Sequence, residues 1–425
     1  MACEQDIIVG IDFGTTFSGP SFQKVHNLSS RPIVDSDFTG IAFIIPPYDR
    51  VDNPSREIQI FQSWEAEKGS DKTPSILAYS EESPSLPLSP WKLQTLAQPA
   101  ESLSWFKLLL DEELDIENWI REVQGWASSR GIFYIPEGMT ALQVITDFLG
   151  CLRDALWKRL RTAVNTSEVN FDTTHIQFWF TVPVSWSDTT RALMREAIRN
   201  AGFSTRDGDE VHLLTEPQAA MTFALADKSL FLVGDGVIIC DCGGGTVDLA
   251  SYQISHDNPL IFDELAHSNG ELCGSTLIDR EFYRLMCERF GDAFRNLPRE
   301  KISPSSAFMK AFEKIKCKFD KSTGTIHRLS LIMSIEKPLN AKCADLEVFF
   351  NNALAKIAKA LQHQIEEANN SAREIMINKI ILVGGFSLSP YLYRNLQRLF
   401  GSSYIIHRPN MGSGFVGIRR LPASN

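Results

Sequence analysis

The sequence predicts an α/β protein of two lobes, and a repeated hairpin is the main observation behind this prediction. Residues 7–19 (IIVGIDFGTTFSG) and 237–254 (VIICDCGGGTVDLASYQI) share one order of residue types: an apolar run, an aspartate, then glycines and a threonine. The apolar runs are typical of strands buried on both faces, and a second apolar strand is expected after each turn. Strand, turn and helix patterns alternate along the rest of the chain. A duplicated hairpin in an alternating chain indicates two lobes.

The composition is that of a globular protein with room for two such lobes. The 425 residues are 44% hydrophobic and 22% charged, and the net charge is −10. This acidic balance argues against nucleic-acid partners and anionic membranes, which need a basic patch. No apolar run approaches the roughly 20 residues of a membrane helix, and the eight cysteines show no CxxC or zinc spacing. Because the start of the chain lacks a signal-peptide pattern, we expect the protein in the cytoplasm or the nucleus.

We expect residues 1–229 together with 405–425 to form the first lobe. Its predicted elements are, in order, strands at 7–13 and 19–25, strands within 40–60, a Ser/Pro-rich loop at 80–104, a helix at 140–164, a strand at 175–182, a helix at 185–202 and a strand at 211–216. Thr140 is the expected N-cap of the first helix, and Gly202 lies at the C′ position of the second.

We expect residues 230–404 to form the second lobe. Its predicted elements are, in order, the hairpin at 237–254, helices at 275–291 and 305–320, a strand at 325–335, a long amphipathic helix at 345–370, a strand at 379–383 and a helix at 390–400. The strand at 379–383 leads into a double glycine, Gly384-Gly385, which permits close approach of a flat ligand such as adenosine. An ordinary strand-to-helix turn would need only one of these glycines.

Asp12 and Asp241 end the first strand of each hairpin. A buried carboxylate is costly unless it is paired, hydrogen-bonded or bound to a cation. Two of them in matching contexts favour Mg²⁺ held mainly through water, because this cation dehydrates reluctantly. The alternative is that each aspartate caps its tight turn with an Asx hydrogen bond.

The residues of the two turns offer backbone N–H and hydroxyl donors to phosphate oxygens. They are Gly14, Thr15 and Thr16 in the first turn, and Gly243, Gly244, Gly245 and Thr246 in the second. Neither the GxxxxGK[ST] loop nor the GxGxxG fingerprint of other nucleotide sites occurs in them. One GGGT sequence alone could be a tight hairpin. Two related turns predict a clamp that holds ATP between the lobes.

Four further side chains are candidates for chemistry, each with a structural alternative. Glu216 could orient or deprotonate an attacking water, or it could be an exposed carboxylate at a helix start. Lys107, within the apolar stretch SWFKLL, could neutralise charge on a γ-phosphate, or it could be a snorkelling surface lysine. Glu313 and Lys316 lie three apart on one helical face and could hold ribose hydroxyls or form a surface ion pair.

These segments together resemble the nucleotide-binding domain of the seventy-kilodalton heat-shock chaperones. The resemblance rests on GIDFGTTFS, KTPSILA, TVPVSWSDTTRALMREAIRNAGF, LLTEPQAAMTFAL, CDCGGGTVDL and ILVGGFSLSPYLYRNLQRLF, and it spans about residues 6–401. It implies the two-lobed actin-like ATPase fold of duplicated ribonuclease-H-like domains. ATP or ADP with Mg²⁺ is the implied ligand, and a co-chaperone or client protein is the implied partner.

The resemblance also implies a role for each matched residue. Asp12, Thr15, Thr16 and Phe17 match the first phosphate segment, and Lys107 matches the lysine at the γ-phosphate. Glu216 matches the glutamate of the Glu-Pro pair. The second phosphate segment is matched by Asp241, Gly243, Gly244, Gly245, Thr246 and Asp248, and a third ligand segment by Gly274. Glu313 and Lys316 match the ribose pair, and Gly384 and Gly385 the adenosine turn.

The chain departs from the family at the base and at its end. The two arginines beside adenine are replaced by Cys317 and Leu388, and the serine after the double glycine by Phe386, so we expect a more apolar base pocket. A glycine pair in the third ligand segment is Gly274-Ser275 here. The given sequence ends in HRPNMGSGFVGIRRLPASN, and we expect neither the linker nor the β-rich peptide-binding domain of the chaperones. This resembles a divergent branch of the family that lacks the peptide-binding half.

We expect a chaperone-like Mg-dependent ATPase with slow turnover. One alternative is a nucleotide-sensing scaffold with little hydrolysis, which the lost arginines favour and the retained carboxylates oppose. Another is a sugar or polyol kinase of the same fold, which would need an aspartate base beside a polar sugar pocket. The chaperone-like segments TVPVSW and LTEPQAA argue against the kinase.

Overall fold

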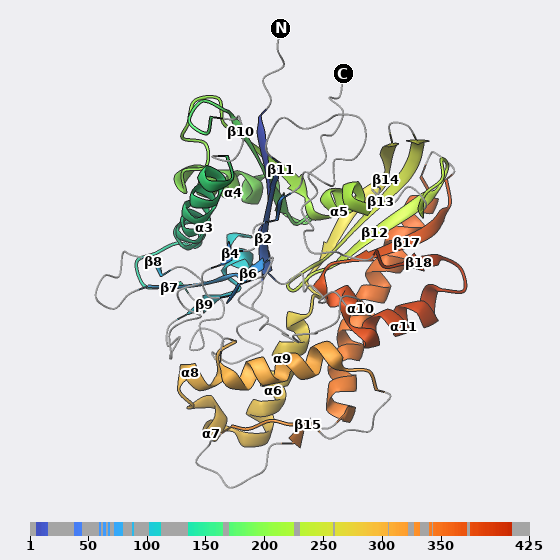
Figure 1. The fold of residues 1–425 in the computed structure, drawn as a ribbon. Helices are drawn as coiled ribbons and strands as arrows, with labels where there is room; N and C mark the ends of the chain where they lie inside the picture. Colours follow the sequence, from blue (N-terminus) through green and yellow to red (C-terminus); the bar gives the residue numbers. More distant parts are fainter. Residues whose placement is uncertain are drawn as a thin grey trace.

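Two β-sheets with helices against their faces form the centre of the molecule (Figure 1). The computed structural model describes residues 6–15, 38–44, 59–60, 63–64, 67–68, 72–79, 87–88, 102–111, 135–164, 170–224, 230–257, 260–304, 306–321, 327–331, 340–341, 343–371 and 375–409. Both sheets carry parallel central strands rich in β-branched residues, as strands covered on two sides do.

The first sheet has the strand order β11-β10-β1-β2-β3, and β6 also pairs with β2. Its strands are β1 (Ile7–Asp12), β2 (Phe38–Ile44), β3 (Gln59–Ile60), β6 (Lys72–Pro74), β10 (Ile176–Val182) and β11 (Glu210–Thr215). Strands β1, β10 and β11 are parallel, whereas β2 runs antiparallel to β1. The strand β1 therefore has an antiparallel partner, as the hairpin pattern predicts, but this partner comes later in the sequence than expected. Residues 38–44 form that partner strand, and the predicted strand at 19–25 lies outside the described residues.

Helices α3 (Ala141–Val164) and α4 (Asp188–Asn200) cover one face of the first sheet. The Thr140 hydroxyl accepts a hydrogen bond from the Gln143 N–H at 3.2 Å, which confirms the predicted N-cap. Ser187 caps α4 in the same way, and Gly202 has a φ of 86° just after that helix ends. Phe148 of α3 stacks on Phe13 with ring centroids 5.3 Å apart, so the end of β1 is fixed in the core.

The second sheet has the order β14-β13-β12-β17-β18. Its strands are β12 (Gly236–Cys242), β13 (Val247–Asp257), β14 (Leu260–Glu271), β17 (Ile377–Val383) and β18 (Ile405–His407). The antiparallel pair β12–β13 is the predicted second hairpin, and β17 lies parallel to β12 on its other side. Helix α10 (Cys343–Asn369) lies on one face of the sheet, and the amphipathic helix α11 (Pro390–Phe400) packs on α10.

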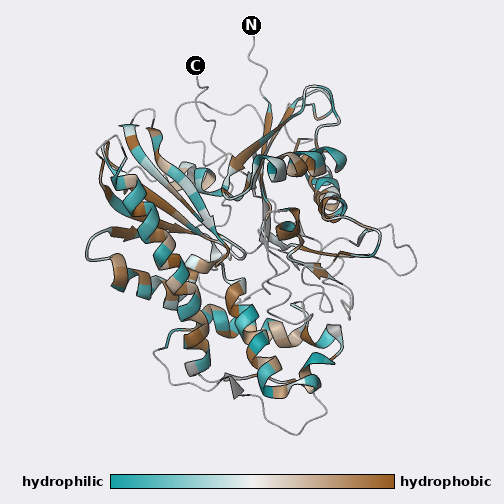
Figure 2. Cartoon of the chain, turned by 180° about the vertical axis from the view of Figure 1, so that it is seen from behind, coloured by the Kyte–Doolittle hydropathy of each residue, from teal (hydrophilic) through white to brown (hydrophobic). Residues whose placement is uncertain are grey.

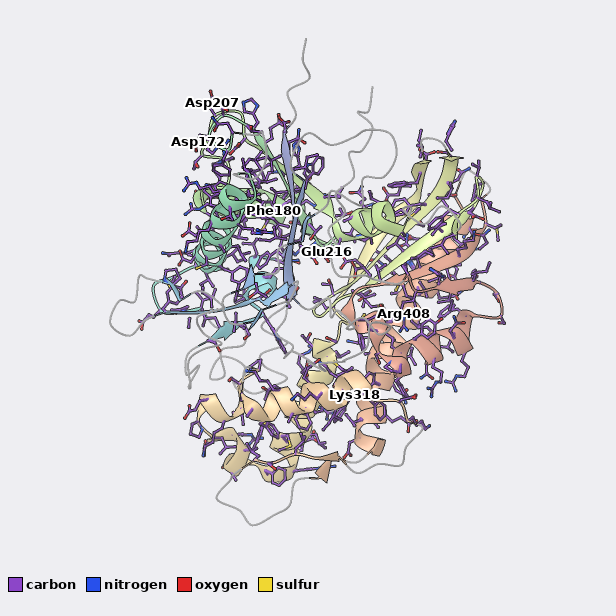
Figure 3. The ribbon with its side chains drawn as sticks, viewed as in Figure 1. Asp172, Phe180, Asp207, Glu216, Lys318 and Arg408 are labelled. Atoms are coloured by element: carbon purple, nitrogen blue, oxygen red, sulfur yellow. The ribbon has the colours of Figure 1, made fainter. Side chains whose placement is uncertain are left out.

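Helix α5 (Glu216–Ala224) comes directly after β11 of the first sheet in the sequence, but it packs on the second sheet. Ala220, Met221 and Ala224 of α5 share a buried cluster with Val237 and Ile239 of β12. Glu216 begins this helix directly after β11, so it lies where the two sheets meet. In Figure 3 it is labelled between them.

A group of helices extends the second lobe beyond its sheet (Figure 1). They are α6 (Thr276–Phe290), α7 (Asp292–Arg295), α8 (Arg299–Ile302) and α9 (Ala307–Lys318). Phe282 of α6 stacks on Phe312 of α9 at 3.8 Å between ring centroids, which joins the two long helices. The strand expected at 325–335 is described only as β15 (His327–Arg328), paired with β16 (Asn340–Ala341).

Short elements complete the described part of the chain. They are β4 (Ser63–Trp64), β5 (Glu67–Lys68), β7 (Ile76–Tyr79), β8 (Pro87–Leu88), β9 (Leu103–Ser104), the 3₁₀-helix η2 (Phe106–Leu110) and the 3₁₀-helix η5 (Gly385–Leu388). β8 and β9 pair with β7, so two strands fall within the stretch expected to be a loop.

The last described strand, β18, lies in a different lobe from the one predicted. The sequence predicts residues 405–425 in the first lobe, but β18 pairs with β17 and belongs to the second sheet. Residues 410–425 lie outside the described residues. None of the described helices is long and apolar enough to cross a membrane. The helices instead carry both hydrophilic and hydrophobic residues along their length (Figure 2).

Candidate functional site

The aspartates that end the two matching strands both lie at the junction of the sheets. Asp12, at the end of β1, accepts a hydrogen bond from the Thr181 hydroxyl at 2.9 Å. Asp241, near the end of β12, is 9% exposed and stands opposite Asp248 in the β12–β13 register. Directly opposed residues in a hairpin point to the same face, so Asp241 and Asp248 share one side of the sheet.

Lys107 and Glu216 form an ion pair inside this junction. The Lys107 ammonium lies 2.7 Å from Glu216 Oε1, and the two side chains are 1% and 17% exposed. The lysine is buried because SWFKLL folds as η2, with Phe106 and Leu108 packed in the cores on either side. The aromatic rings of Phe13 and Trp186 flank the ammonium at 5.5 and 5.4 Å. Neither residue is therefore a surface group, which removes the structural alternative for both.

Burial and neighbouring acids raise the pKa of Glu216 to about 7. Burial is the largest cause, the carboxylates of Asp248 and Asp12 add to it, and the Lys107 ammonium opposes it. Burial also raises the pKa of Asp248, although this carboxylate accepts hydrogen bonds from the Thr246 hydroxyl at 2.6 Å and the Val184 N–H at 2.9 Å. Among the described residues, the carboxylates of Asp12 and Asp248 raise the pKa of Glu216 against the opposing Lys107 ammonium, so added positive charge would be favoured at this junction.

The second glycine turn is held by the segment that contains Gly274. The Gly243 N–H donates to the Thr246 carbonyl at 3.0 Å, which closes the turn. The N–H groups of Gly274, Ser275 and Thr276 donate to the carbonyls of Gly245, Gly243 and Gly244 at 3.2, 3.1 and 2.9 Å. A Cβ on Gly274 would lie 2.4 Å from the Gly244 carbonyl oxygen, so only glycine permits this docking.

The two turns face each other across the lobes. A Cβ on Gly245 would lie 2.9 Å from the Thr15 methyl group, so the second turn contacts the first directly. The Val184 N–H of the first lobe donates to Asp248 of the second. Thr15 of the first turn therefore lies against the second turn, whereas Thr16 and Phe17 lie outside the described residues.

A cavity of about 320 Å³ opens beside the clamp between α9 and η5. Glu313 and Lys316 line it from α9 and are 6% and 4% exposed. The Lys316 ammonium lies 2.6 Å from Glu313 Oε2 and 2.8 Å from Asp279 Oδ2. A buried lysine between two carboxylates fixes the position of Glu313, and this excludes the surface ion pair considered from the sequence.

The double glycine forms the other side of the cavity. Gly384 has a φ of 80°, and a Cβ there would lie 2.4 Å from the Cys242 carbonyl oxygen and 2.3 Å from Asp241 Oδ1. This close approach connects the aspartate of the clamp to the cavity. Gly385 lines the cavity at the start of η5, followed by Phe386 and Leu388. Cys317 lines it from α9, so the three substituted positions of the base pocket come together.

The sequence did not single out several residues of this site. Asp279 is 7% exposed and pairs with Lys316, Thr181 orients Asp12, and Trp186 flanks Lys107. Trp186 lies in TVPVSW, a segment that contributes to the family resemblance but shows no local sign of a site residue. Asp279 falls three residues into α6 and carries no signal besides its place in a predicted helix.

Comparison with known proteins agrees with this geometry. The family model described as Hsp70 protein matches residues 59–405, most of the chain. The chain belongs to the Hsp70 family. Its α/β architecture, with two sheets and a clamp between them, is that of the Hsp70 actin-like ATPase fold.

The similarity to curated members of this family is distant. The chain is 24% identical over 360 residues to the mitochondrial heat shock 70 kDa protein of Pisum sativum, which covers 80% of this chain and 48% of that protein. The chain therefore spans about half the length of this curated relative. At this identity the relative supports the family and the fold, while the chemistry of this chain rests on its own residues.

Proposed function

We propose that this protein binds ATP with Mg²⁺ between its two lobes and hydrolyses it slowly, as a chaperone-type nucleotide switch. The observation that carries the proposal is the buried Lys107–Glu216 pair, 2.7 Å apart, set among Asp12, Asp241 and Asp248 at the meeting of two glycine turns. Hsp70 family membership supports the same nucleotide. We further propose that the protein works in the cytoplasm or nucleus with a co-chaperone or client protein.

The chain's own residues would each act on the phosphate end of the nucleotide. N–H groups of the two turns and the hydroxyls of Thr15 and Thr246 would donate to phosphate oxygens. The Lys107 ammonium would neutralise charge that develops on the γ-phosphate. Glu216, with a pKa of about 7, would accept a proton from the attacking water near neutral pH or orient that water.

Mg²⁺ fits the donor set as a cation held largely through water. In the described part of the chain, the carboxylates of Asp12, Asp248 and Glu216 lie close enough to one another to raise the pKa of Glu216, so a cation would be stabilised beside them. Within the described residues, no group of three or more His, Cys, Asp and Glu side chains is arranged to ligate a metal directly. Mg²⁺ keeps most of its water ligands and commonly binds through one or two carboxylates plus phosphates. Asp12 and Asp241 would therefore hold the ion by accepting hydrogen bonds from its bound waters. When bound, it would offset the phosphate charge.

The nucleoside would lie along the cavity between α9 and η5. Glu313 and Lys316 would hold the ribose hydroxyls, and the Gly384-Gly385 turn would let the adenosine approach the backbone. A nucleotide-sensing scaffold with little hydrolysis is a second candidate, because the cavity is lined by Cys317 and Leu388 where the family has arginines. Measured turnover separates the two, and an unchanged ATP consumption on addition of sugars or polyols would exclude the kinase alternative.

Calorimetric titration of the purified chain with Mg-ATP tests the proposal. We expect binding in the micromolar range that is lost in Asp241→Ala and kept in Asp292→Ala, a matched change at an aspartate whose side chain is 83% exposed. Binding by the wild type and by both variants alike would remove Asp241 from the site. No binding by a folded wild-type chain would overturn the proposal.

A further inference from the structure

The first glycine turn is held by a serine from another part of the first lobe. Ser75 lies between β6 and β7 and is 1% exposed. Its hydroxyl donates a hydrogen bond to the Gly14 carbonyl oxygen at 2.7 Å, across 61 residues of sequence. The turn is therefore fixed by a side chain that belongs neither to β1 nor to its partner β2.

The backbone around Ser75 is itself fixed on both sides. Before it, β6 pairs with β2, and after it, Ile76 of β7 pairs with Ser104 of β9. Strand β9 leads into η2, which carries Lys107. Because strand pairing holds this serine from both directions, its hydroxyl restricts the turn and does not follow it. One segment thus supports both the first turn and Lys107.

The hydrogen bond fixes the orientation of one peptide group. The Gly14 carbonyl and the Thr15 N–H belong to the same planar trans peptide, so they point in opposite directions. Since the carbonyl is directed at Ser75, the Thr15 N–H is directed away from it. Glycine allows a wide range of backbone angles, so without this bond the peptide could rotate and present its carbonyl oxygen in place of the N–H.

The Thr15 side of this peptide borders the second turn. Thr15 is 8% exposed, and a Cβ on Gly245 would lie 2.9 Å from its methyl group. In the proposed binding mode, the phosphates lie between the two turns. An N–H group there would donate to a phosphate oxygen, whereas a carbonyl oxygen would repel it. The orientation of this peptide therefore decides whether the first turn attracts or repels the charge of the ligand.

We propose that Ser75 is a positioning residue for the nucleotide, whose hydroxyl keeps the Thr15 N–H directed at the phosphates. The inference rests on the nucleotide function proposed above. In this role Ser75 acts only through the Gly14 carbonyl and contacts no atom of the ligand. A serine with a merely structural role would contribute to folding stability alone. The two roles differ in the hydrogen bond between Thr15 and a bound phosphate, which can be measured.

The test is a nuclear magnetic resonance titration of the full chain, labelled with ¹⁵N on threonine only. The Thr15 amide signal is identified as the one that disappears in Thr15→Ser. We expect Mg-ADP to shift the Thr15 amide proton downfield in the wild type, because its N–H then donates to a charged phosphate oxygen. In Ser75→Ala saturated with the same ligand, we expect this shift to be lost.

Calorimetry with Mg-ADP measures the consequence for binding. We expect the affinity to fall about fivefold in Ser75→Ala, the effect of one misdirected hydrogen bond. Ser75→Cys retains a donor weaker than a hydroxyl, so its affinity and its Thr15 shift should lie between those of Ser75→Ala and the wild type.

The variant Ser255→Ala is the matched control. The Ser255 hydroxyl also donates to a backbone carbonyl, that of Ile261, at 3.2 Å. It lies toward the outer end of β13, about 20 Å along the strand from Asp248. Loss of this hydroxyl should leave both the Mg-ADP affinity and the Thr15 shift as they are in the wild type.

Each result decides one or both of the proposals. Equal downfield shifts in the wild type and in Ser75→Ala would overturn the role of Ser75. A Thr15 amide that does not shift in a wild type saturated with Mg-ADP would also overturn it, while leaving the nucleotide function in place. A folded wild type that binds no Mg-ADP would overturn both. If Ser75→Ala does not fold, the wild-type titration and the Ser75→Cys shift still decide.

Discussion

Glu216 is the residue whose environment departs furthest from that of an ordinary surface carboxylate. Its pKa of about 7 lies above the ordinary glutamate value of 4.5, so the folded state binds a proton between about pH 4.5 and 7 that the unfolded state has released. Stability from this group is therefore fully present below pH 4.5 and is lost as the pH rises through 7. The total loss is on the order of 3–4 kcal/mol, because each unit of difference in pKa corresponds to about 1.4 kcal/mol.

The variant Glu216→Gln tests whether stability falls with rising pH because of this carboxyl group. We expect the free energy of unfolding of the wild type to fall between pH 5 and 8 more steeply than that of the variant, measured by urea denaturation at several pH values. Some slope should remain, because burial also raises the pKa of Asp248. Glu288→Gln, at a side chain 56% exposed, should follow the wild type. Parallel curves for wild type and Glu216→Gln would contradict the assignment.

The Lys107 ammonium stabilises the charged form of the buried Glu216 carboxylate. Its replacement by methionine keeps the apolar stem but leaves Glu216 buried without its cation. We expect a loss of about 3–5 kcal/mol in the free energy of unfolding at pH 8, where Glu216 would otherwise be charged. The loss should shrink at pH 5, because protonated Glu216 no longer needs a counterion. An equal loss at both pH values would show that packing, and not charge, explains the effect.

At the scale of elements, the turns at the proposed nucleotide site depend on glycines, because a side chain there would collide with neighbouring atoms. Gly384 has a φ of 80°, and a Cβ would also strike the Cys242 carbonyl oxygen at 2.4 Å. Gly138 has nearly the same φ, 79°, but a Cβ there meets nothing within 4 Å. Gly138→Ala should therefore cost only the left-handed conformation, about 1–2 kcal/mol. Gly384→Ala should cost more and weaken ATP binding, measured by thermal denaturation and calorimetry. Equal losses in the two variants would contradict the close approach.

The same elements show how far the sequence predicts the fold. The hairpin at β12–β13 and the helices α3, α4, α10 and α11 follow from local apolar patterns, caps and glycines, and they are confirmed. The predicted pairing of β1 with residues 19–25 was wrong, because β1 pairs with residues 38–44. Strand pairing depends on contacts between residues distant in sequence, whereas the apolar pattern alone favoured the next apolar segment. Sequence matching identified both Lys107 and Glu216, but their contact spans 109 residues and leaves no local signal. The base-pocket substitutions were predicted, whereas the pairing of Lys316 with Asp279 became visible only in the structure.

At the scale of the whole molecule, the lobes are joined at the site itself. Asp248 accepts the Val184 N–H across the lobes, Gly245 packs on Thr15, and a Cβ on Gly270 would lie 2.7 Å from the Ser185 Cβ. Ligands that bridge such a junction favour the closed arrangement by the difference in their affinity for the closed and open forms. A change in lobe angle is therefore the expected output of nucleotide binding.

Removal of the Asp248 acceptor should loosen the lobes without removing their cores. In Asp248→Ala the Val184 N–H and the Thr246 hydroxyl lose a charged partner, at a cost of about 1–3 kcal/mol that a more open cleft relieves by admitting water. We expect small-angle scattering to give a larger radius of gyration for this variant than for the wild type without nucleotide. Asp292→Ala should match the wild type. Mg-ATP should bring the variant closer to the wild-type value, since in the proposed binding mode the phosphates would contact both turns. Identical scattering curves for Asp248→Ala and wild type would show that apolar contacts, such as those of α5 on the second sheet, hold the lobes together without this hydrogen bond.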